Sequence, residues 1–362
     1  MKKLTAIILV ILMVTTMFVA CGQQTQPEPP APPANGGDAP GSNGETTPPA
    51  DTMPRLGAAM IDIVNPFFVE IIEAGNMAAY DFGVTINWYS AEGSLDRQIT
   101  IVENLIEAAY DVILVDAIDT VGIAAVVARA VEAGIPVVSM AQLVETATVC
   151  TLFNDFVFSQ IQTEILWHSV GQQGTLGLIF GISGNFGSDE RQRGFNAVAD
   201  RFGITTVQAP MNFNPDEAYV AAAAMLAGNP DLSGIFCISD ASTLAVLSAV
   251  QDAGREGEVG IVSNDGTLEG CEAVRDGDFI STVLMGPRRV GYWNVMIAAQ
   301  IAHGETFDFI LYLPQHLIAT LELQDRIVNE WGMDVSHITM VTPEEGLRLN
   351  HAYREEFGGI SG

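Results

Sequence analysis

Residues 55–90 read RLGAAMIDIVNPFFVEIIEAGNMAAYDFGVTINWYS, and this stretch decides the fold. Its first part, Leu56–Val64, is an apolar run that ends at Asn65-Pro66. Apolar residues then recur at helical spacing through Phe67–Phe82, and a second short apolar segment follows at Val84–Tyr89. The stretch therefore predicts a strand, a helix and another strand.

The same alternation continues along the chain in two series. The first series goes on with helices Asp96–Ala109 and Thr120–Ala133 and strands Val112–Asp116 and Val137–Met140. The second begins near Gly174, with strands Thr175–Phe180, Thr205–Ala209, Gly234–Ser239 and Gly260–Ser263 and helices Glu190–Phe202, Pro215–Ala227, Ser242–Ala253 and Leu268–Asp276. Continuous apolar strands between helices indicate parallel sheets covered on both faces. The predicted fold class is α/β, with two doubly wound parallel-sheet lobes.

Length and composition agree with two lobes and restrict the function. The 362 residues exceed what one hydrophobic core usually organises, and 48% are hydrophobic while 16% are charged. The formal net charge is −29, and after Lys2 and Lys3 the chain carries only Arg as its basic residue, 13 against 44 Asp plus Glu. Nucleic acids and anionic headgroups need basic patches, so we expect no nucleic-acid partner.

The N-terminus has the pattern of an export signal. Lys2 and Lys3 precede an uncharged run, Leu4–Ala20, which is shorter than the roughly 20 residues of a spanning helix. The run ends at Phe18-Val19-Ala20-Cys21, which resembles the bacterial lipobox, with Phe18 in place of the usual Leu. We predict a signal peptide at 1–20 and lipidation of Cys21, which would hold the protein at the outer face of the cell membrane or in the periplasm. Residues 21–54 are rich in Pro and Gly and are predicted to be a disordered tether.

The residues that usually carry metal or covalent chemistry show no such spacing. Cys150, Cys237 and Cys271 form no CxxC pair and are expected to be buried thiols. The five histidines show no HxxxH spacing, and Gly181–Asn185 lacks the last glycine of a nucleophile elbow. We therefore expect no metal, no cofactor and no enzymatic activity.

Polar residues follow several of the predicted strands. Asn65 and Asp119 follow strands of the first series, and Asp240 and Asp265 follow strands of the second. In open parallel sheets, ligands bind beyond the carboxyl ends of the strands. The sequence therefore predicts two crevices that face each other.

Several motifs, in this order and spacing, resemble the type I periplasmic binding proteins, in particular their ribose-binding branch, over roughly Leu56–Thr320. The motifs are Ile63-Val64-Asn65-Pro66-Phe67-Phe68, Ala133-Gly134-Ile135-Pro136-Val137-Val138, Glu190-Arg191-Gln192-Arg193-Gly194-Phe195, Ser263-Asn264-Asp265-Gly266-Thr267 and Tyr312-Leu313-Pro314. The resemblance implies a monomeric, lipid-anchored solute-binding protein that delivers a small ligand, a sugar or sugar-like metabolite, to an ABC permease.

The resemblance also implies a three-strand hinge, with crossings near Thr151–Asn154, Thr282–Pro287 and Leu311–Ile318. The N-terminal lobe is then expected at 55–152 plus 287–312, and the C-terminal lobe at 153–286 plus 313–323. Residues 324–362 form a C-terminal extension beyond the family's usual end, with a short strand at Ile338–Val341 and a helix at Pro343–Phe357.

Matching positions imply the ligand contacts. The matching residues are Asn65, Phe67, Phe68, Arg191, Phe213 and Asp265. The predicted ligand-binding residues also include Asp119 and Asp240, which follow strands, and Gln142 and Met285, at positions where the pattern differs. Phenyl rings can cover the apolar face of a sugar, while Asn, Arg and Asp bind its hydroxyls. The ribose-binding pattern is not kept at Ala141-Gln142, Ser239 and Met285, which leaves a deoxy-sugar, a less hydroxylated ring or a related polar metabolite open.

Structural roles are an alternative for the same residues. Phe67 and Phe68 can serve as core residues, Asn65 as a helix cap, Arg191 as a solvated charge and Asp265 as a turn residue. The function also has an alternative, because a sensor or a quorum-signal binder that presents its closed form to a receptor or kinase needs the same capture chemistry.

Overall fold

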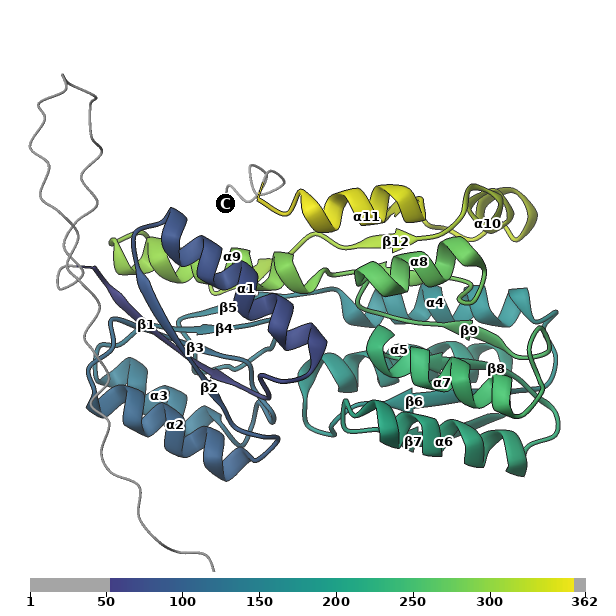
Figure 1. Ribbon diagram of the computed structural model, residues 1–362, viewed down its shortest axis with the longest axis horizontal. Coiled ribbons are helices and arrows are strands. Elements are labelled where there is room, and N and C mark those ends of the chain that lie inside the picture. Colours follow the sequence, from purple (N-terminus) through teal and green to yellow (C-terminus); the bar gives the residue numbers. More distant parts are fainter. Residues whose placement is uncertain (1–52, 355–362) are drawn as a thin grey trace, which may run out of the picture. The chain divides into compact units, whose positions relative to one another are not determined.

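The computed structural model describes residues 53–354, and Figure 1 draws the rest of the chain as a grey trace. The predicted signal peptide 1–20, the lipidation site Cys21 and all but the last two residues of the 21–54 tether lie outside the described residues. The same holds for 355–362, which include the end of the predicted helix Pro343–Phe357.

The first sheet is parallel, with strand order β11-β5-β4-β3-β1-β2. Its strands are β1 (Arg55–Met60), β2 (Thr85–Ser90), β3 (Val112–Val115), β4 (Val137–Ser139), β5 (Val149–Leu152) and β11 (Ile310–Tyr312). One face carries α1 (Pro66–Asp81) and α9 (Pro287–Ala302), and the other carries α2 (Leu95–Glu107) and α3 (Ala124–Glu132). Right-handed crossovers put α1 and the α2–α3 pair on opposite faces, because the chain reverses direction across the sheet at β2.

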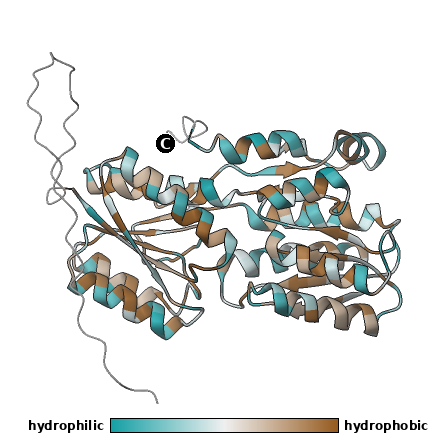
Figure 2. Ribbon diagram, viewed as in Figure 1, coloured by the Kyte–Doolittle hydropathy of each residue, from teal (hydrophilic) through white to brown (hydrophobic). Residues whose placement is uncertain are grey.

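The second sheet is also parallel, with order β7-β6-β8-β9. Its strands are β6 (Thr175–Phe180), β7 (Thr206–Pro210), β8 (Leu232–Cys237) and β9 (Gly260–Val262). The helices are α4 (Asp155–Ser169), α5 (Phe186–Phe202), α6 (Pro215–Gly228), α7 (Asp240–Asp252) and α8 (Leu268–Asp276). Helix α4 packs on α5, and α6 packs on α7. Figure 2 shows hydrophobic strands between helices of mixed hydropathy, as the sequence predicts for sheets covered on both faces.

Three passages of chain connect the two sheets. They run from β5 into α4, from β10 (Thr282–Leu284) into α9, and from β11 to β12 (His316–Ile318). Strand β10 pairs antiparallel with β12, which pairs in parallel with β13 (Thr339–Val341). The three passages lie at the crossings that the family resemblance implies, and α9 returns to the first sheet as expected. The sheet of β10, β12 and β13, which we call the hinge sheet, adjoins the second and third crossings, while β13 comes from the C-terminal extension.

The C-terminal extension packs along the hinge and contacts elements of both lobes. It contains the last two residues of α10 (Leu321–Asp325), a π-helical turn (Arg326–Glu330), β13 and α11 (Pro343–His351). Helix α11 packs on α8 of the second lobe, where the Asn350 side chain donates a hydrogen bond to the Gly266 carbonyl at 2.8 Å. Just beyond α11, Arg354 forms an ion pair with Asp81 of α1 at 2.6 Å. The extension therefore spans from one lobe to the other.

Some element boundaries differ from the sequence prediction. The helix expected at Thr120–Ala133 begins at Ala124, because the Asp119 carboxylate accepts hydrogen bonds from the amides of Val121 and Gly122 and holds a turn there. The helix expected from Glu190 begins at Phe186, because the Asn185 side chain caps the Ser188 amide. Helix α4 was not predicted: both its faces are largely buried, so its apolar residues form no single stripe.

The cysteines behave as the sequence predicts. Cys150, Cys237 and Cys271 are buried free thiols.

We predict that the C-terminal extension is part of the folded body. Ile327 is fully buried in a cluster with Phe158 and Ile165 of α4 and with Leu317 of β12, while its neighbour Val328 is 47% exposed. Ile327→Ala should lower the free energy of unfolding by about 2–5 kcal/mol, because it leaves a cavity. The matched control Val328→Ala should change it by less than about 0.5 kcal/mol. Denaturant unfolding followed by circular dichroism measures both, and equal effects would contradict the prediction.

Candidate functional site

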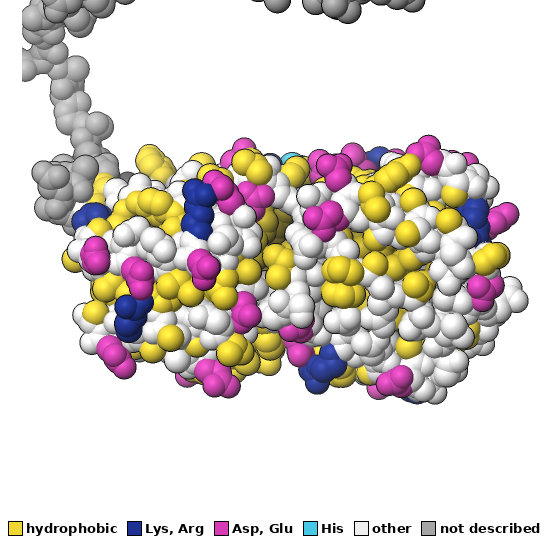
Figure 3. All heavy atoms as spheres, turned by 90° about the horizontal axis from the view of Figure 1, so that it is seen from below, with side chains coloured by type: hydrophobic (Ala, Val, Ile, Leu, Met, Phe, Trp, Pro, Cys, Tyr) yellow, Lys and Arg dark blue, Asp and Glu magenta, His cyan; other side chains and the backbone are white. Residues whose placement is uncertain are grey.

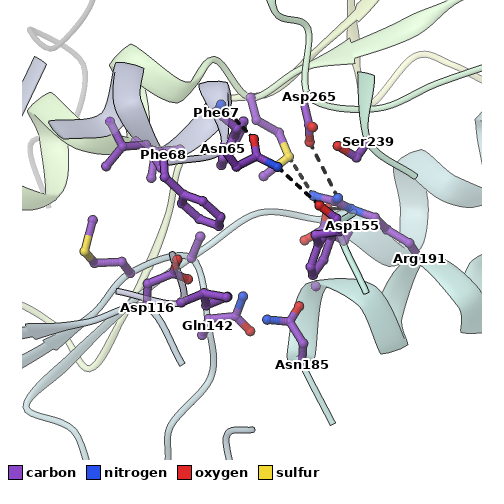
Figure 4. A pocket seen from close by; sticks show the side chains of 18 residues that line it. Asn65, Phe67, Phe68, Asp116, Gln142, Asp155, Asn185, Arg191, Ser239 and Asp265 are labelled. Carbon is purple, nitrogen blue, oxygen red and sulfur yellow. Dashed lines mark hydrogen bonds and ion pairs between the residues drawn. The ribbon is translucent and has the colours of Figure 1, made fainter. Parts of the chain in front are cut away.

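A pocket lies where the carboxyl ends of strands from both sheets face each other. Its lining includes phenyl rings, aliphatic side chains, three carboxyl groups and one guanidinium group (Figure 4). The lining residues are Ile61, Asn65, Phe67, Phe68, Ile71, Asp116, Met140, Ala141, Gln142, Asp155, Asn185, Gly187, Arg191, Phe213, Ser239, Asp265, Met285 and Val290.

The loop between β1 and α1 supplies the aromatic wall. Asn65 caps α1, because its side-chain oxygen accepts a hydrogen bond from the Phe67 amide at 3.0 Å, and Pro66 occupies the first helical position. This cap places Phe67 and Phe68 in the first turn, with ring centroids 5.6 Å apart and planes at 86°. The structural role considered for Asn65 is therefore real, and it is the reason that the two rings reach the pocket.

Arg191 organises the opposite wall. It lies in α5, and only 6% of its surface is exposed. Its Nε donates to Asp155 Oδ1 at 2.9 Å, its Nη1 donates to the Ile238 carbonyl at 2.9 Å, and Nη1 lies 3.6 Å from Asp265 Oδ1. Figure 4 shows the three charged side chains together. A guanidinium group held by two carboxylates is fixed in orientation, so Arg191 is not a solvated surface charge.

The backbone at Asp265 is held in a conformation that L-residues seldom adopt. Its φ is 121°, which typically costs about 1–3 kcal/mol and persists only where neighbouring structure enforces it. Here its amide donates to the Val283 carbonyl at 3.1 Å, and its carbonyl accepts from the amides of Met285 and Gly286 at 3.0 Å. The hinge strand β10 therefore sets the direction in which the Asp265 carboxylate points.

Asp116 and Gln142 belong to the first-lobe wall. Asp116 directly follows β3, and Gln142 follows the neighbouring strand β4. The Gln98 amide holds the chain at this point, because its Nε2 donates to the Asp116 carbonyl at 2.6 Å. Within residues 53–354, no hydrogen-bond partner reaches the buried Gln142 Oε1.

Direct contacts between the lobes enclose the pocket. Asn65 Nδ2 donates to the Phe213 carbonyl at 3.2 Å, and Asn185 Nδ2 donates to the Ala117 carbonyl at 3.1 Å. The Phe213 ring lies so close to Gly181 that a Cβ there would come within 2.4 Å of it, so only glycine fits. The enclosed cavity has a volume of about 70 Å³.

Burial shifts the acid–base properties of the pocket. It raises the pKa of Asp116 to about 7, an effect that the Ile61 amide partly offsets. It also raises the pKa of Asp265 to about 7, although the Arg191 guanidinium acts in the other direction. For Arg191 itself, burial favours the neutral form, but the charges of Asp155 and Asp265 outweigh it and the pKa is raised. Arg191 therefore stays charged. The unfavourable effect of burial on ionised groups appears instead in the raised pKa values of Asp116 and Asp265.

The structure brings most of the predicted ligand-binding residues into this one pocket. The residues that line it are Asn65, Phe67, Phe68, Gln142, Arg191, Phe213, Asp265 and Met285. Asp119 and Asp240 do not line it. The Asp119 carboxylate faces the turn that precedes α3.

Asp240 has a structural role instead. Its side chain is fully buried, and its carboxylate accepts hydrogen bonds from the Thr267 amide at 2.8 Å and from the Thr282 hydroxyl at 2.7 Å. A Cβ at Gly270 would lie 2.0 Å from the same carboxylate. Asp240 therefore joins α7 to α8 and to the hinge strand β10.

The sequence reasoning assigned no ligand contact to four polar residues of the pocket, Asp116, Asp155, Asn185 and Ser239. Asp116 is the last residue of a predicted strand, so the rule that ligands bind at strand ends could have found it. Asp155 and Asn185 precede or begin helices whose starts were not recognised. Correct helix boundaries would have placed both at the mouth of the second sheet.

The surface offers no extended basic region on the face seen in Figure 3, where acidic side chains are spread among fewer arginines. Within the described residues, no helix is both long and apolar enough to cross a membrane.

Comparison with known proteins places the chain among binding proteins. Residues 56–306 match the sequence model of the periplasmic binding protein domain. The ribose import binding protein of Bacillus subtilis is 23% identical over 319 residues, which cover 88% of this chain and 99% of that protein. The xylitol-binding protein of Mycolicibacterium smegmatis is 28% identical over 246 residues, which cover 67% and 70% of the two chains.

The fold is shared with solved structures. An ABC transporter solute-binding protein of Bacillus halodurans, with bound myo-inositol, superimposes with a TM-score of 0.69 at 21% sequence identity. The match covers 77% of this chain and 97% of that one. This likeness supports the two-lobe fold.

We predict that Arg191 stabilises the second lobe. Arg191→Ala should lower the free energy of unfolding by about 3–5 kcal/mol, because it leaves the buried carboxylates of Asp155 and Asp265 without a counter-charge. Arg193→Ala is the matched control: Arg193 lies two residues further along α5, with 61% of its side chain exposed. That substitution should cost less than about 1 kcal/mol. Thermal and denaturant unfolding measure both variants, and an Arg191→Ala protein as stable as Arg193→Ala would refute the role.

Proposed function

The chain belongs to the periplasmic binding protein family, and from this premise we propose that it is the solute-binding component of an ABC importer. It captures one small sugar or sugar-like molecule between its lobes and delivers it to the permease. The observation that carries this proposal is the convergence of side chains from both lobes on one enclosed pocket.

The pocket has the chemistry that a carbohydrate requires. The rings of Phe67, Phe68 and Phe213 can cover the C–H face of a sugar ring. Asn65, Arg191 and Asp265 can bind hydroxyl groups that lose their water on entry. The named binding of ribose and xylitol by relatives supports the same ligand class.

Capture by closure explains why contacts cross the lobes. The bonds from Asn65 to Phe213 and from Asn185 to Ala117 form only when the lobes meet. A ligand that touches both walls adds to these contacts and shifts the population toward the closed form.

Membership of the family implies that the protein is exported. We further propose that lipidation of Cys21 holds it at the outer face of the membrane, with residues 22–54 as the tether. The supporting observation is the sequence Phe18-Val19-Ala20-Cys21 after a short apolar run. We also propose that the protein is monomeric and that the tether lets its folded body move above the bilayer.

We predict that a carbohydrate binds in the pocket and that Asp265 is needed. In a thermal-shift screen of pentoses, hexoses, deoxy-sugars, polyols and nucleosides, at least one carbohydrate should stabilise the protein, by about 2.7 kcal/mol at a hundredfold excess over Kd. Asp265→Ala should weaken binding of that compound at least tenfold, about 1.4 kcal/mol. Asp276→Ala, at the exposed end of α8, should change it little. Stabilisation by an amino acid or purine, but by no carbohydrate, would refute the sugar assignment.

We predict that Cys21 carries the membrane anchor. When the full chain is produced in a bacterium that processes lipoproteins, it should partition with the membrane fraction, while Cys21→Ala should be released in soluble form. A chain starting at Arg55 should behave like the Cys21→Ala protein. Unchanged membrane retention of a processed Cys21→Ala protein would show that another segment holds it.

A further inference from the structure

The charges that line the pocket do not balance. Its charged side chains are those of Asp116, Asp155, Asp265 and Arg191, so three carboxyl groups face one guanidinium group. When all four are ionised, the enclosed site has two negative charges in excess. Burying such an excess is costly unless the charges are paired or neutralised.

The hydrogen bonds and ion pairs of Arg191 are made to residues of the second-lobe wall. Its Nε and Nη1 atoms bind Asp155 Oδ1 and the Ile238 carbonyl, both at 2.9 Å, and Nη1 also faces Asp265. Figure 4 shows this group on the side of the pocket away from Asp116. The guanidinium group therefore compensates the carboxylates of its own lobe.

Asp116 has no comparable partner. Only 8% of its surface is exposed, and among the described residues no ion pair includes it. Since every lysine of the chain lies in its first three residues, no lysine of the folded body can serve. Burial raises the pKa of Asp116 to about 7, so a proton competes with any cation for this carboxylate near neutral pH.

Gln142, in the same wall as Asp116, has an acceptor atom that lacks a hydrogen-bond donor among the described residues. Gln142 Oε1 is buried in the same wall and lacks a donor within residues 53–354. The ring of Phe68, 7% exposed, lines the same pocket, and the face of a phenyl ring attracts a cation. A carboxylate, a free carbonyl oxygen and a phenyl ring together match an ammonium group, which brings three donors and one positive charge.

A neutral sugar meets only part of this requirement. Hydroxyl groups can donate hydrogen bonds to Asp116 and Gln142, but they leave the excess charge in place. An ammonium group donates the same bonds and removes one negative charge from the balance. Both a hydroxyl and an ammonium group form charge-assisted hydrogen bonds to a carboxylate. The difference between the two ligands is therefore the net charge of the occupied site.

We propose that the ligand is an amine-bearing sugar or cyclitol, whose ammonium group is held by Asp116 and Gln142 of the first lobe. This inference rests on the proposed function, because it assumes that a carbohydrate-like molecule fills the pocket. Arg191 and Asp265 then bind hydroxyl groups on the far side of the same ring.

Matched triads of compounds test the inference by calorimetry at pH 7. Each triad has the same ring with a hydroxyl, an amine or an N-acetyl group at one position: glucose, glucosamine and N-acetylglucosamine, and the corresponding galactose and mannose series. A cyclitol pair, scyllo-inositol and scyllo-inosamine, extends the set. The N-acetyl compounds keep the nitrogen but remove its charge. We expect at least one amine to bind tenfold or more tightly than both of its neutral counterparts.

Two variants assign this preference to Asp116. Asp116→Asn keeps the shape of the side chain and removes its charge, so it should weaken binding of the amine at least tenfold more than binding of the neutral counterpart and thereby remove the preference. Glu132→Gln removes one exposed carboxylate at the end of α3 in the same lobe, and it should leave the preference intact. Both variants are checked for folding by circular dichroism.

The outcomes separate the inference from the proposed function. Neutral sugars that bind as tightly as their amines would overturn the inference and leave the sugar-binding function standing. So would an Asp116→Asn variant that weakens all members of a triad equally, because Asp116 would then act as a general acceptor. If no compound of either kind binds the folded wild-type protein, both the function and the inference fail. The comparison of amines with their neutral counterparts on the wild-type protein tests the inference even if the Asp116→Asn variant does not fold.

Discussion

The buried guanidinium group of Arg191 is the interaction on which the second lobe and its half of the pocket depend. It joins α5 to Asp155 at the start of α4, to the chain after β8 through the Ile238 carbonyl, and to Asp265 beside the hinge. Each of these segments ends at the pocket. A buried charge that loses its partner is strongly destabilising. Moving any one of these segments away from Arg191 would therefore leave an uncompensated charge in the interior. The same group therefore fixes the fold locally and orients the ligand-binding wall.

Strand β10 of the hinge sheet connects these second-lobe residues to the first lobe. Strand β10 holds the unusual backbone conformation of Asp265, and the hydroxyl group of its Thr282 donates a hydrogen bond to the Asp240 carboxylate. It then leads directly into α9, which packs on the first sheet. The C-terminal extension adds β13 to the same hinge sheet and reaches both lobes through Asn350 and Arg354. The extension therefore connects the hinge sheet to both lobes.

The two walls of the pocket differ in what compensates their charge. In the second lobe, carboxylates and guanidinium are paired before any ligand arrives. In the first lobe, Asp116 and Gln142 follow neighbouring strands; no described residue forms an ion pair with Asp116, and none donates a hydrogen bond to Gln142 Oε1. Closure therefore favours a ligand that supplies what the first wall lacks, while the second wall acts as a rigid template.

The sequence by itself determined the alternation of strands and helices and the position of polar residues such as Asn65 and Asp265 after strands, because both follow from local periodicity and turn chemistry. It could not tell Asp265 from Asp240, since both follow strands of the second sheet. Only the tertiary structure decided which of the two lines the pocket. Backbone hydrogen bonds to β10 and the residues after it direct Asp265 toward the pocket, while the Asp240 carboxylate accepts a hydrogen bond from Thr282 of the same strand. Likewise, Asp155 and Arg191 are 36 residues apart in the chain, and their ion pair exists only because α4 and α5 pack together. Pairings between distant segments depend on packing, which no local pattern records.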